Sequence, residues 1–305
     1  MNGKKVLITG GTGLIGKRLT ALLLEKGYQI AYLSRKKSNI PSVQVYEWDV
    51  AKGYIEAGAV ENTDYLIHLA GAAVADGRWT EERKKEIISS RTETIALIGK
   101  ALREKNIRPT AFISASGSSY YGEDSGDVRN TEQSPAGKDF LSHVTVVWEQ
   151  AADRIAEMGV RTVKLRTGIV LSKDGGALPQ MAAPAKFGFG APLGSGKQWV
   201  SWIHLDDLCR MYIEAMENES WEGAYNAVAS QPVTNAELTK QICIALDKPQ
   251  WLPNVPSFAL KLAFGDMANV VLGSNYLINE RIAKETTFEY QFLELDKALR
   301  DIYAK

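Results

Sequence analysis

The fold is decided by a glycine-rich segment near the N-terminus, Thr9-Gly10-Gly11-Thr12-Gly13-Leu14-Ile15-Gly16. The segment follows the apolar run Val6–Thr9 and opens a helical pattern of apolar residues over Leu14–Lys26. Glycines at this spacing, between a strand and a helix, are typical of a loop that holds the phosphates of a dinucleotide. The free N–H groups at the start of such a helix attract the anion. The segment therefore predicts a dinucleotide-binding α/β domain.

Each glycine of this spacing has its own expected role. Gly10 allows a tight turn, Gly13 lets the backbone approach the pyrophosphate, and Gly16 lets the helix pack closely on the strand. A structural glycine-rich turn without a ligand is the alternative. The residues of this loop that are expected to contact the cofactor are Gly10, Thr12, Gly13, Leu14, Ile15 and Gly16.

The first half of the chain alternates short apolar runs with helical patterns. Such alternation is typical of βαβ units, which form a parallel sheet covered by helices on both faces. We therefore expect a Rossmann-type, doubly wound parallel sheet. Strands are expected at Val6–Thr9, Gln29–Ser34, Gln44–Glu47, Tyr65–Leu69, Ala111–Ser114 and Thr162–Leu165, and helices at Leu14–Lys26, Thr80–Lys105 and Phe140–Met158.

The second half has a different texture, because Lys173–Lys197 is rich in glycine, proline and alanine. A helix is expected at Leu208–Glu217 with Asp206 or Asp207 as its N-terminal cap, and a short strand-like run at Thr287–Tyr290. We predict a cofactor-binding domain of residues 1–172 and 198–230. Residues 173–197 and 231–305 are expected to form a smaller mixed domain.

The composition excludes several classes of protein. The 305 residues contain 36 Lys and Arg and 36 Asp and Glu, so the formal net charge is zero. Because nucleic acids and anionic membranes attract clustered basic residues, neither partner is expected. Two cysteines and three histidines are too few for a disulfide framework or a zinc site, so no metal is predicted. With no apolar run near the roughly 20 residues of a membrane span, we expect a cytoplasmic protein.

The end of the second expected strand indicates which dinucleotide binds. An acidic residue in this place would accept a hydrogen bond from the ribose 2′-hydroxyl of NAD(H). The chain instead has Ser34-Arg35-Lys36-Lys37. The guanidinium of Arg35 can pair with the 2′-phosphate of NADP(H), which an acid would repel. NADP(H) is therefore favoured over NAD(H), and a solvated basic turn is the alternative.

Further motifs resemble the extended short-chain dehydrogenase/reductase superfamily. They are the glycine-rich loop, His68-Leu69-Ala70-Gly71-Ala72, Ser114-Ala115-Ser116 and Leu165-Arg166-Thr167-Gly168. The segments Gly194–Trp199, Trp202–Asp207 and Phe288–Leu299 resemble the atypical "epimerase family protein" subgroup, which has a C-terminal extension. The resemblance spans essentially the whole chain. It implies that the cofactor also contacts Asp49, Val50, Ala70, Gly71, Ala72 and Arg166.

The resemblance also implies an NADP(H)-dependent oxidoreductase or epimerase-like enzyme for a small hydroxyl, carbonyl or sugar-type substrate. The superfamily uses a Tyr-x-x-x-Lys pair, with an acidic residue four positions after the lysine. If Glu149 is that acid, Leu141 and Thr145 occupy the tyrosine and lysine positions, so both functional groups are missing. Since a free phenol has a pKa near 10 and needs a neighbouring cation, a catalytically impaired NADP(H)-binding sensor or scaffold is a second hypothesis.

Replacement catalytic groups are suggested by the same resemblance. Ser116 and Ser118 are candidates to donate hydrogen bonds to a substrate oxygen, and Tyr121 or a water is a candidate to handle the proton. Serine hydroxyls that cap a turn are the alternative for the first two.

Four more residues outside the loop carry predictions. Lys186 and Lys197 are candidates to grip an anionic substrate group. Arg91 stands where the superfamily has a structural asparagine, and we expect it in an ion pair on a helix face, or else pointing into the pocket. His204 is expected to be structural, satisfying backbone groups. Relatives often dimerise through the helices expected at 80–105 and 140–158, so a homodimer is a further hypothesis.

Overall fold

The computed structural model describes residues 3–304 and is built around an eight-stranded sheet. Neighbouring strands run parallel, except for the antiparallel pair at one edge, β3 and β4. In order across the sheet the strands are β12 (Gly223–Ala227), β8 (Arg161–Thr167), β6 (Ala111–Gly117), β5 (Thr63–His68), β1 (Lys5–Thr9), β2 (Gln29–Ser34), β3 (Val43–Asp49) and β4 (Tyr54–Ile55).

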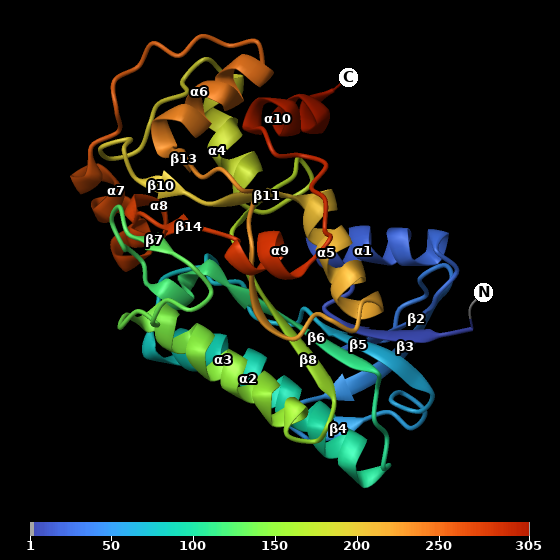
Figure 1. The fold of residues 1–305 in the computed structure, drawn as a ribbon. Coiled ribbons are helices and arrows are strands. Elements are labelled where there is room, and N and C mark those ends of the chain that lie inside the picture. Colours follow the sequence, from blue (N-terminus) through green and yellow to red (C-terminus); the bar gives the residue numbers. More distant parts are fainter. Residues whose placement is uncertain (1–2, 305) are drawn as a thin grey trace.

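Helices cover both faces of this sheet, as Figure 1 shows. On one face α1 (Leu14–Glu25) packs beside α5 (Leu205–Glu217). On the other face α2 (Glu81–Glu104) packs beside α3 (Phe140–Ala156). The arrangement confirms the predicted Rossmann-type, doubly wound fold.

Strand β1 shows why the sheet needs cover on both faces. Successive side chains of a strand point to opposite faces. Val6 and Ile8 are fully buried in a cluster with Leu19 of α1, whereas Leu7 is fully buried in a second cluster with Ile98 of α2. A strand that is buried on both faces reads as a continuous apolar run, which is the pattern of a parallel sheet.

The strands and helices predicted in the first half of the chain all form, and their ends differ from the prediction by at most three residues. The sequence does not reveal β4, which has two residues, or β12, whose residues Gly-Ala-Tyr-Asn-Ala lack an apolar run. Because β1, β2, β5 and β6 are parallel neighbours, the loops after them meet at one edge of the sheet. This is the edge at which α/β sheets bind ligands.

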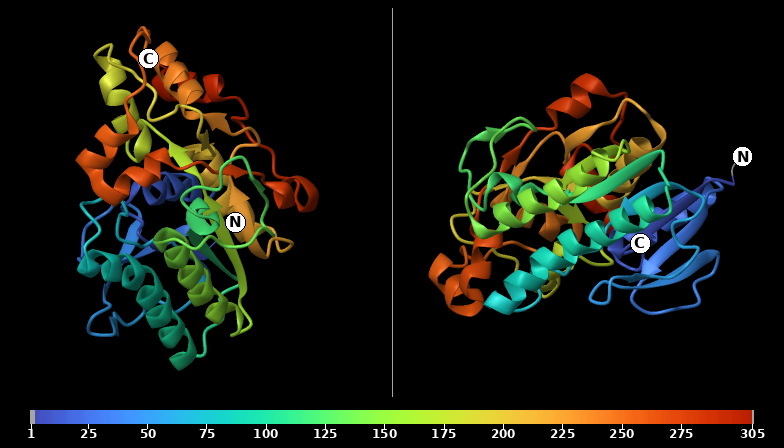
Figure 2. Two further views of the ribbon diagram at one scale, coloured as in Figure 1. Left: turned by 90° about the vertical axis from the view of Figure 1, so that its left-hand side faces the viewer. Right: turned by 90° about the horizontal axis from the view of Figure 1, so that it is seen from below.

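The remaining elements gather beside the sheet, mostly above it in the left-hand view of Figure 2. A third apolar cluster joins helices α4, α6 and α10. The elements outside the main sheet and its four covering helices are α4 (Ala177–Lys186), α6 (Asn235–Ala245), α7 (Ser257–Phe264), α8 (Asn269–Leu272), α9 (Glu280–Glu285), α10 (Leu295–Tyr303), the 3-10 turns η1 (Ser118–Tyr121) and η2 (Gly265–Ala268), and the paired short strands β9 (Ile169–Leu171) with β11 (Trp202–His204), β10 (Trp199–Val200) with β13 (Val233–Thr234), and β7 (Arg129–Asn130) with β14 (Tyr276–Leu277). The predicted division into two domains stays a prediction.

Helix α5 begins earlier than predicted and has a different cap. It starts at Leu205, and His204 caps it by accepting a hydrogen bond at Nδ1 from the N–H of Asp206, at 3.1 Å. The carboxylate of Asp206 instead pairs with Arg18 of α1, at 2.7 Å. The His204 ring packs against Phe292, with ring centroids 3.9 Å apart. The structural role expected for His204 is therefore confirmed, and an aspartate cap is wrong.

The C-terminal segment is fastened to α5 through Asp207. This carboxylate is fully buried and accepts hydrogen bonds from the N–H groups of Gln291 and Phe292, at 2.8 and 2.9 Å. The strand-like run predicted at Thr287–Tyr290 does not form a strand. Its aromatic side chains pack instead, and the Tyr290 hydroxyl donates to the carbonyl of Val228 at 2.8 Å.

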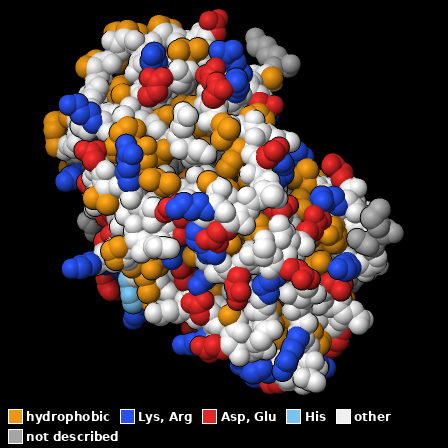
Figure 3. Space-filling model, viewed as in Figure 1, with side chains coloured by type: hydrophobic (Ala, Val, Ile, Leu, Met, Phe, Trp, Pro, Cys, Tyr) orange, Lys and Arg blue, Asp and Glu red, His pale blue; other side chains and the backbone are white. Residues whose placement is uncertain are grey.

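Charges are mixed over the face seen in Figure 3, where Lys and Arg alternate with Asp and Glu. Within residues 3–304, no helix is long and apolar enough to cross a membrane. The same residues contain no cluster of three or more His, Cys, Asp or Glu side chains that could hold a metal ion. Cys209 and Cys243 are buried and are not joined in a disulfide.

Candidate functional site

The glycine-rich segment forms a tight loop between β1 and α1, with Thr12 and Gly13 exposed at its tip. Gly10 has a φ of +68°, a left-handed conformation that favours glycine. A Cβ on Gly10 would lie 2.8 Å from the carbonyl carbon of Leu69, and a Cβ on Gly16 would lie 2.6 Å from the carbonyl oxygen of Gly10. The loop is therefore folded against the chain after β5 and against the first turn of α1.

Gly11 is required by a contact that the glycine spacing does not reveal. A Cβ on Gly11 would lie 2.3 Å from the ring of Tyr32 on β2. The Tyr32 hydroxyl in turn shares a 2.6 Å hydrogen bond with Thr20 of α1. The aromatic ring thus braces the loop against its own helix, and only a residue without a side chain fits above it.

The start of α1 is open to an anion. Its cap, Gly13, offers no side-chain hydrogen bond, and the first turn holds no acidic residue. The first hydrogen bond of the helix runs from Lys17 N–H to the Gly13 carbonyl at 3.0 Å. The earlier N–H groups, those of Leu14, Ile15 and Gly16, therefore have no acceptor within the helix. Such donors, beside a loop without bulky side chains, fit the pyrophosphate of a dinucleotide.

Two of the three basic side chains in the turn after β2 form no ion pair with the described residues. The N–H of Lys36 donates to Ser34 Oγ at 3.4 Å, which shapes the turn. Lys37 pairs with Glu56 at 2.8 Å. Arg35 and Lys36 are exposed and form no ion pair with any of the residues 3–304. A guanidinium without a partner therefore stands at the end of β2, the place beside the adenosine ribose in this fold.

Two further loops at this edge are held by local contacts. The carboxylate of Asp49 pairs with Lys52 at 3.0 Å and accepts a hydrogen bond from its backbone N–H at 3.1 Å, which together hold the pKa of Asp49 below its usual range. Val50 is half-buried beside it. After β5, the N–H of Ala70 donates to Thr9 Oγ1 at 3.1 Å, which ties that loop to β1.

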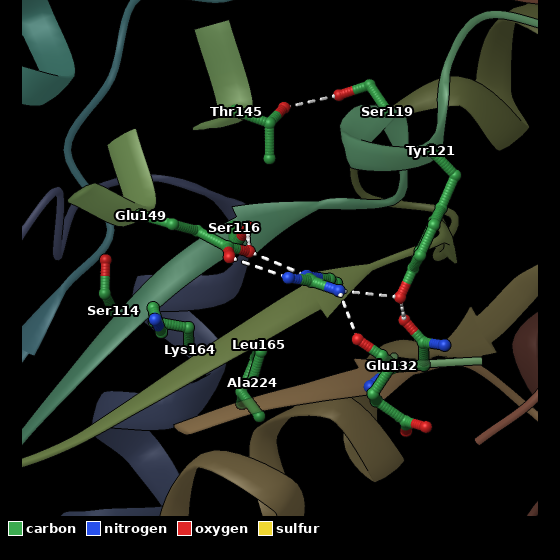
Figure 4. Close-up of polar contacts among 12 residues, drawn as sticks. Ser114, Ser116, Ser119, Tyr121, Glu132, Thr145, Glu149, Lys164, Leu165 and Ala224 are labelled. Carbon is green, nitrogen blue, oxygen red and sulfur yellow. Dashed lines mark hydrogen bonds and ion pairs between the residues drawn. The ribbon is translucent and has the colours of Figure 1, made fainter. Parts of the chain in front are cut away.

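A buried ion pair lies where catalytic groups were expected. Arg166 on β8 donates from Nε and Nη2 to the two carboxylate oxygens of Glu149 on α3, each at 2.8 Å. Ser116, near the end of β6, donates to the same carboxylate at 2.6 Å (Figure 4). Burial alone would lower the pKa of Arg166, but the contact with Glu149 outweighs it and the pKa is raised. The Ser116 hydroxyl and the Arg166 guanidinium are thus engaged by the chain itself.

Tyr121 belongs to the same network. Its hydroxyl donates to Asn226 Oδ1 at 2.7 Å and accepts from Nη1 of Arg166 at 2.9 Å. The same Nη1 donates to the carbonyl oxygen of Glu132, whose carboxylate accepts from the N–H of Asn226, each at 3.0 Å. Burial raises the pKa of Tyr121 to about 12, so the phenol keeps its proton at neutral pH. Sequence reasoning missed Glu132 and Asn226, because neither residue lies in a motif.

Hydroxyl groups surround the positions of the missing tyrosine and lysine. Leu141 and Thr145 are both buried on α3. Thr145 Oγ1 donates to the carbonyl of Leu141 at 2.9 Å and shares a 2.8 Å hydrogen bond with Ser119 (Figure 4). Ser118 is half-buried, and its hydroxyl forms no hydrogen bond within residues 3–304. Ser118 therefore has a hydroxyl that can face a ligand.

Comparison with known families assigns the fold and the loop to a family. Residues 6–227 match the model of the NAD dependent epimerase/dehydratase family. The chain belongs to this family. Residues 255–302 match a second model, DUF1731, which describes a domain of unknown function. The epimerase/dehydratase match covers the sheet through β12, and the second match covers the segment that begins just before α7 and reaches into α10.

Several relatives resemble the chain over its whole length. The chloroplastic homologue of epimerase family protein SDR39U1 from Arabidopsis thaliana is 39% identical, covering 97% of this chain and 86% of the relative. The SDR39U1 protein of Homo sapiens is 35% identical, covering 98% and 100%. The crystal structure of human SDR39U1 (isoform 2) with NADPH has a TM-score of 0.87 at 33% identity, covering 98% and 99%. A Thermotoga maritima UDP-glucose 4-epimerase has a TM-score of 0.78 at 17% identity over 98% and 97%, which shows a shared fold only.

Arg91 of this epimerase/dehydratase family member lies in a different setting from the one predicted. Its side chain is 8% exposed and faces α3, and no carboxylate of residues 3–304 pairs with it, so the expected surface ion pair is wrong. Nη1 donates to the carbonyl of Ile87 at 2.8 Å, and the guanidinium carbon lies 4.9 Å from the centre of the Trp148 ring. Burial, reinforced by the nearby charge of Arg83, lowers the pKa of Arg91 to about 10. A cation is therefore buried between α2 and α3.

The two lysines predicted to grip a substrate lie on the surface. The start of α4 lies close to the glycine-rich loop, since a Cβ on Gly175, two residues before α4, would lie 3.6 Å from Leu14 at the start of α1. Lys186 ends that helix, nine residues after Ala177, which places it roughly 13 Å farther along at 1.5 Å per residue. Lys197 is exposed in the loop before β10. A substrate-binding role for either lysine stays a prediction.

Proposed function

We propose that this protein is an NADP(H)-dependent oxidoreductase that acts on a small substrate with a hydroxyl or carbonyl group. The observation that carries the proposal is the open start of α1, where Gly10 and Gly16 bring the backbone together without a side-chain cap. Membership of the epimerase/dehydratase family supports a nicotinamide dinucleotide. The structure of the human relative, solved with NADPH, supports the phosphorylated form.

The choice of NADP(H) rests on Arg35. Its guanidinium is exposed at the end of β2 and forms no ion pair with the described residues, whereas the neighbouring Lys37 already has Glu56. A free guanidinium recognises a phosphate through two parallel hydrogen bonds. The absence of an acid at this position removes the group that would favour NAD(H).

The bound cofactor would supply the hydride exchange, and the chain would position the substrate. We assign Ser118 as the donor to the substrate oxygen, because its hydroxyl has no partner within residues 3–304. The bond between Ser119 and Thr145 holds the Ser118 turn against α3. Since the Tyr121 hydroxyl already donates a hydrogen bond to Asn226, we assign water as the proton source for the substrate oxygen. Ser116 and Arg166 act by holding Glu149 and Tyr121 in place.

The cofactor choice is tested by fluorescence titration of Arg35→Ala with NADPH and NADH. Losing a charge-assisted contact predicts that the NADPH Kd rises by about tenfold or more, while the NADH Kd changes little. Lys37→Ala is the matched control, because its cation is already paired and its loss leaves Arg35 in place. Equal losses for both cofactors would contradict the assignment.

A sensor or scaffold that binds NADP(H) without turnover is the second candidate. Leu141 and Thr145 in place of the tyrosine and lysine, and the engaged phenol of Tyr121, favour it. NADPH oxidation against a panel of carbonyl compounds separates the two candidates. The enzyme proposal predicts turnover that falls by about 100-fold in Ser118→Ala, the effect of losing one donor to a developing oxyanion. Ser89→Ala on α2 is the control, and NADPH binding without any oxidation supports the sensor.

A further inference from the structure

We propose that Arg91 is an anion-binding residue, and that it takes a phosphate or carboxylate group at the loop after β5. The inference rests on the proposed function and deepens it, because it names the charge of a ligand that binds where the loops after β1, β2, β5 and β6 meet. It rests on the hydrogen-bonding state of the guanidinium, on the loop that lies against it, and on a second arginine beside it.

The guanidinium of Arg91 is only partly satisfied. A guanidinium carries five N–H donors, and burying them without acceptors is costly. Nη1 donates to the carbonyl of Ile87 at 2.8 Å and, weakly, to Ser90 Oγ at 3.5 Å. Nε is buried without a hydrogen-bond partner, and Nη2 forms no hydrogen bond within residues 3–304. The Trp148 ring offers only its face, at 4.9 Å. The Nε–Nη2 edge of the guanidinium thus has no acceptor within residues 3–304.

The surrounding charges do not replace that acceptor. Within residues 3–304, no Asp or Glu lies within ion-pair distance of Arg91. His68, on the neighbouring strand, is uncharged, because burial and the charge of Arg91 lower its pKa to about 3. Elsewhere in the same fold a buried arginine receives a carboxylate, as Arg166 does from Glu149. The chain therefore leaves Arg91 as an uncompensated positive charge.

The loop against Arg91 belongs to the ligand edge of the sheet. Gly71 is exposed, and a Cβ on it would lie 3.1 Å from the guanidinium carbon of Arg91 and 3.3 Å from Nη1 and Nη2. The guanidinium thus lies directly against the backbone of a residue that is open to solvent. The N–H of Ala70, one residue earlier, donates a hydrogen bond to Thr9, directly before the glycine-rich loop. The N–H of Ala72, one residue later, donates to Ser90 Oγ at 2.9 Å.

Arg83 provides the independent second observation. It lies two turns earlier on α2, and its Nε is also buried without a partner. Its Nη2 donates to the carbonyl of Ala73, in the same loop, and its Nη1 pairs with the half-exposed Glu86. Two guanidinium groups therefore contact the segment 71–73, and only that of Arg83 has a carboxylate partner within residues 3–304. A planar anion with two oxygens matches the free edge of Arg91.

The anion has two sources with one chemistry. It is either a phosphate of the bound dinucleotide or an acidic group of the substrate, because both would bind where the loops after β1, β2, β5 and β6 meet. The test uses inorganic phosphate as the probe, exchanged for chloride at constant ionic strength, and reads its Kd from the rise in Tm. It is run on the full chain, with and without saturating NADPH.

Two variants address Arg91 and one serves as control. Arg91→Met removes the charge but keeps the bulk, and Arg91→Lys keeps the charge but loses the planar edge. Arg161→Met is the matched control, because this part-buried arginine already donates hydrogen bonds to the carbonyls of Ala215, Met216 and Trp221. We expect the phosphate Kd to rise about tenfold or more in Arg91→Met, and to be unchanged in Arg161→Met. Without ligand, Arg91→Met should raise Tm, since it removes an unpaired buried charge.

An unchanged phosphate Kd in folded Arg91→Met would overturn the proposal, and Arg91→Lys decides in the same way should the methionine variant fail to fold. Phosphate binding that disappears when NADPH is present, together with a weaker NADPH Kd in Arg91→Met, assigns the anion to the dinucleotide. Phosphate binding that persists beside NADPH assigns it to the substrate. Failure of the wild-type protein to bind NADPH would refute the proposed function alone, because the phosphate measurement on the free protein still stands.

Discussion

Arg91 and Arg166 are two buried arginines near the same edge of the sheet, and their surroundings are opposite. Arg166 donates to both oxygens of Glu149, to Tyr121 and to a backbone carbonyl, so its donors are used inside the fold. Arg91 has one good bond, to the carbonyl of Ile87, and a buried Nε without a partner. Both are nine-tenths buried or more, so exposure does not separate them.

The difference indicates which arginine serves the structure and which serves a ligand. A charge that the chain compensates itself stabilises a local arrangement, here the turn that carries Ser118 and Tyr121. A charge left uncompensated costs stability and persists where a ligand gains from it.

Removing Glu149 should convert Arg166 into a second unpaired charge. Glu149→Ala is expected to lower the free energy of unfolding by about 3–5 kcal/mol, the cost of breaking a buried ion pair from one side. Urea unfolding measures this. Glu157→Ala, at the end of the same helix, is the control and should change little. A loss below about 1 kcal/mol would show that Arg166 finds another acceptor, and the contrast with Arg91 would fail.

The pH dependence of stability tests the charge around Arg91 through His68. An unfolded histidine has a pKa near 6.5, and the folded pKa of His68 is lowered to about 3. Between these values the unfolded chain binds a proton that the folded chain does not, so stability falls as pH drops below 6.5. The slope reaches about 1.4 kcal/mol per pH unit, or roughly 2 kcal/mol by pH 5.

Urea unfolding at pH 7 and pH 5 provides the measurement. His68→Gln should flatten the dependence, and Arg91→Met should reduce it, because the Arg91 charge adds to the effect of burial. His143→Gln, an exposed histidine on α3, is the control. Equal slopes for wild type and His68→Gln would show that the pKa of His68 is not lowered in the folded protein, and would contradict the charge environment described for Arg91.

Tyr121→Phe is expected to have the smallest effect. It removes one hydrogen bond to Asn226 and one from Arg166, but leaves the Glu149 pair intact. A loss of about 1 kcal/mol is expected from thermal unfolding, with unchanged NADPH affinity. If turnover vanished while stability and cofactor affinity stayed the same, Tyr121 would be a catalytic residue and not a positioning one.

Local patterns explain why so much of the first half could be predicted. One contiguous segment contains the run Val6–Thr9, the glycine spacing and the helix that follows. Its strand, loop and helix could therefore be predicted from neighbouring residues alone. The cap of α5 and the run Thr287–Tyr290 depended instead on distant partners. His204 could outcompete the aspartates because Asp206 is drawn to Arg18, 188 residues away. Aromatic packing against other segments satisfies Phe288 and Tyr290 without a strand.

Sequence reasoning identified the part of the candidate site that the backbone builds, the glycine-rich loop, but not how the side chains of the site pair with one another. Glycine spacing and the basic turn indicate a dinucleotide without any knowledge of the tertiary structure. Nothing near Arg91 or Arg166 in the sequence tells which will receive a carboxylate. That outcome depends on where α3 carries Glu149 and Trp148, two adjacent residues that turn toward different arginines.

The anchoring of Gln291 and Phe292 by Asp207 limits how the chain can be shortened. A truncation before residue 287 would delete both backbone donors and leave a carboxylate in the protein interior with Arg210 as its remaining partner. It would also uncover the His204 ring, which Phe292 shields. The C-terminal segment cannot be clipped off as a separate module. Expression of residues 1–286 alone should therefore yield insoluble or protease-sensitive material.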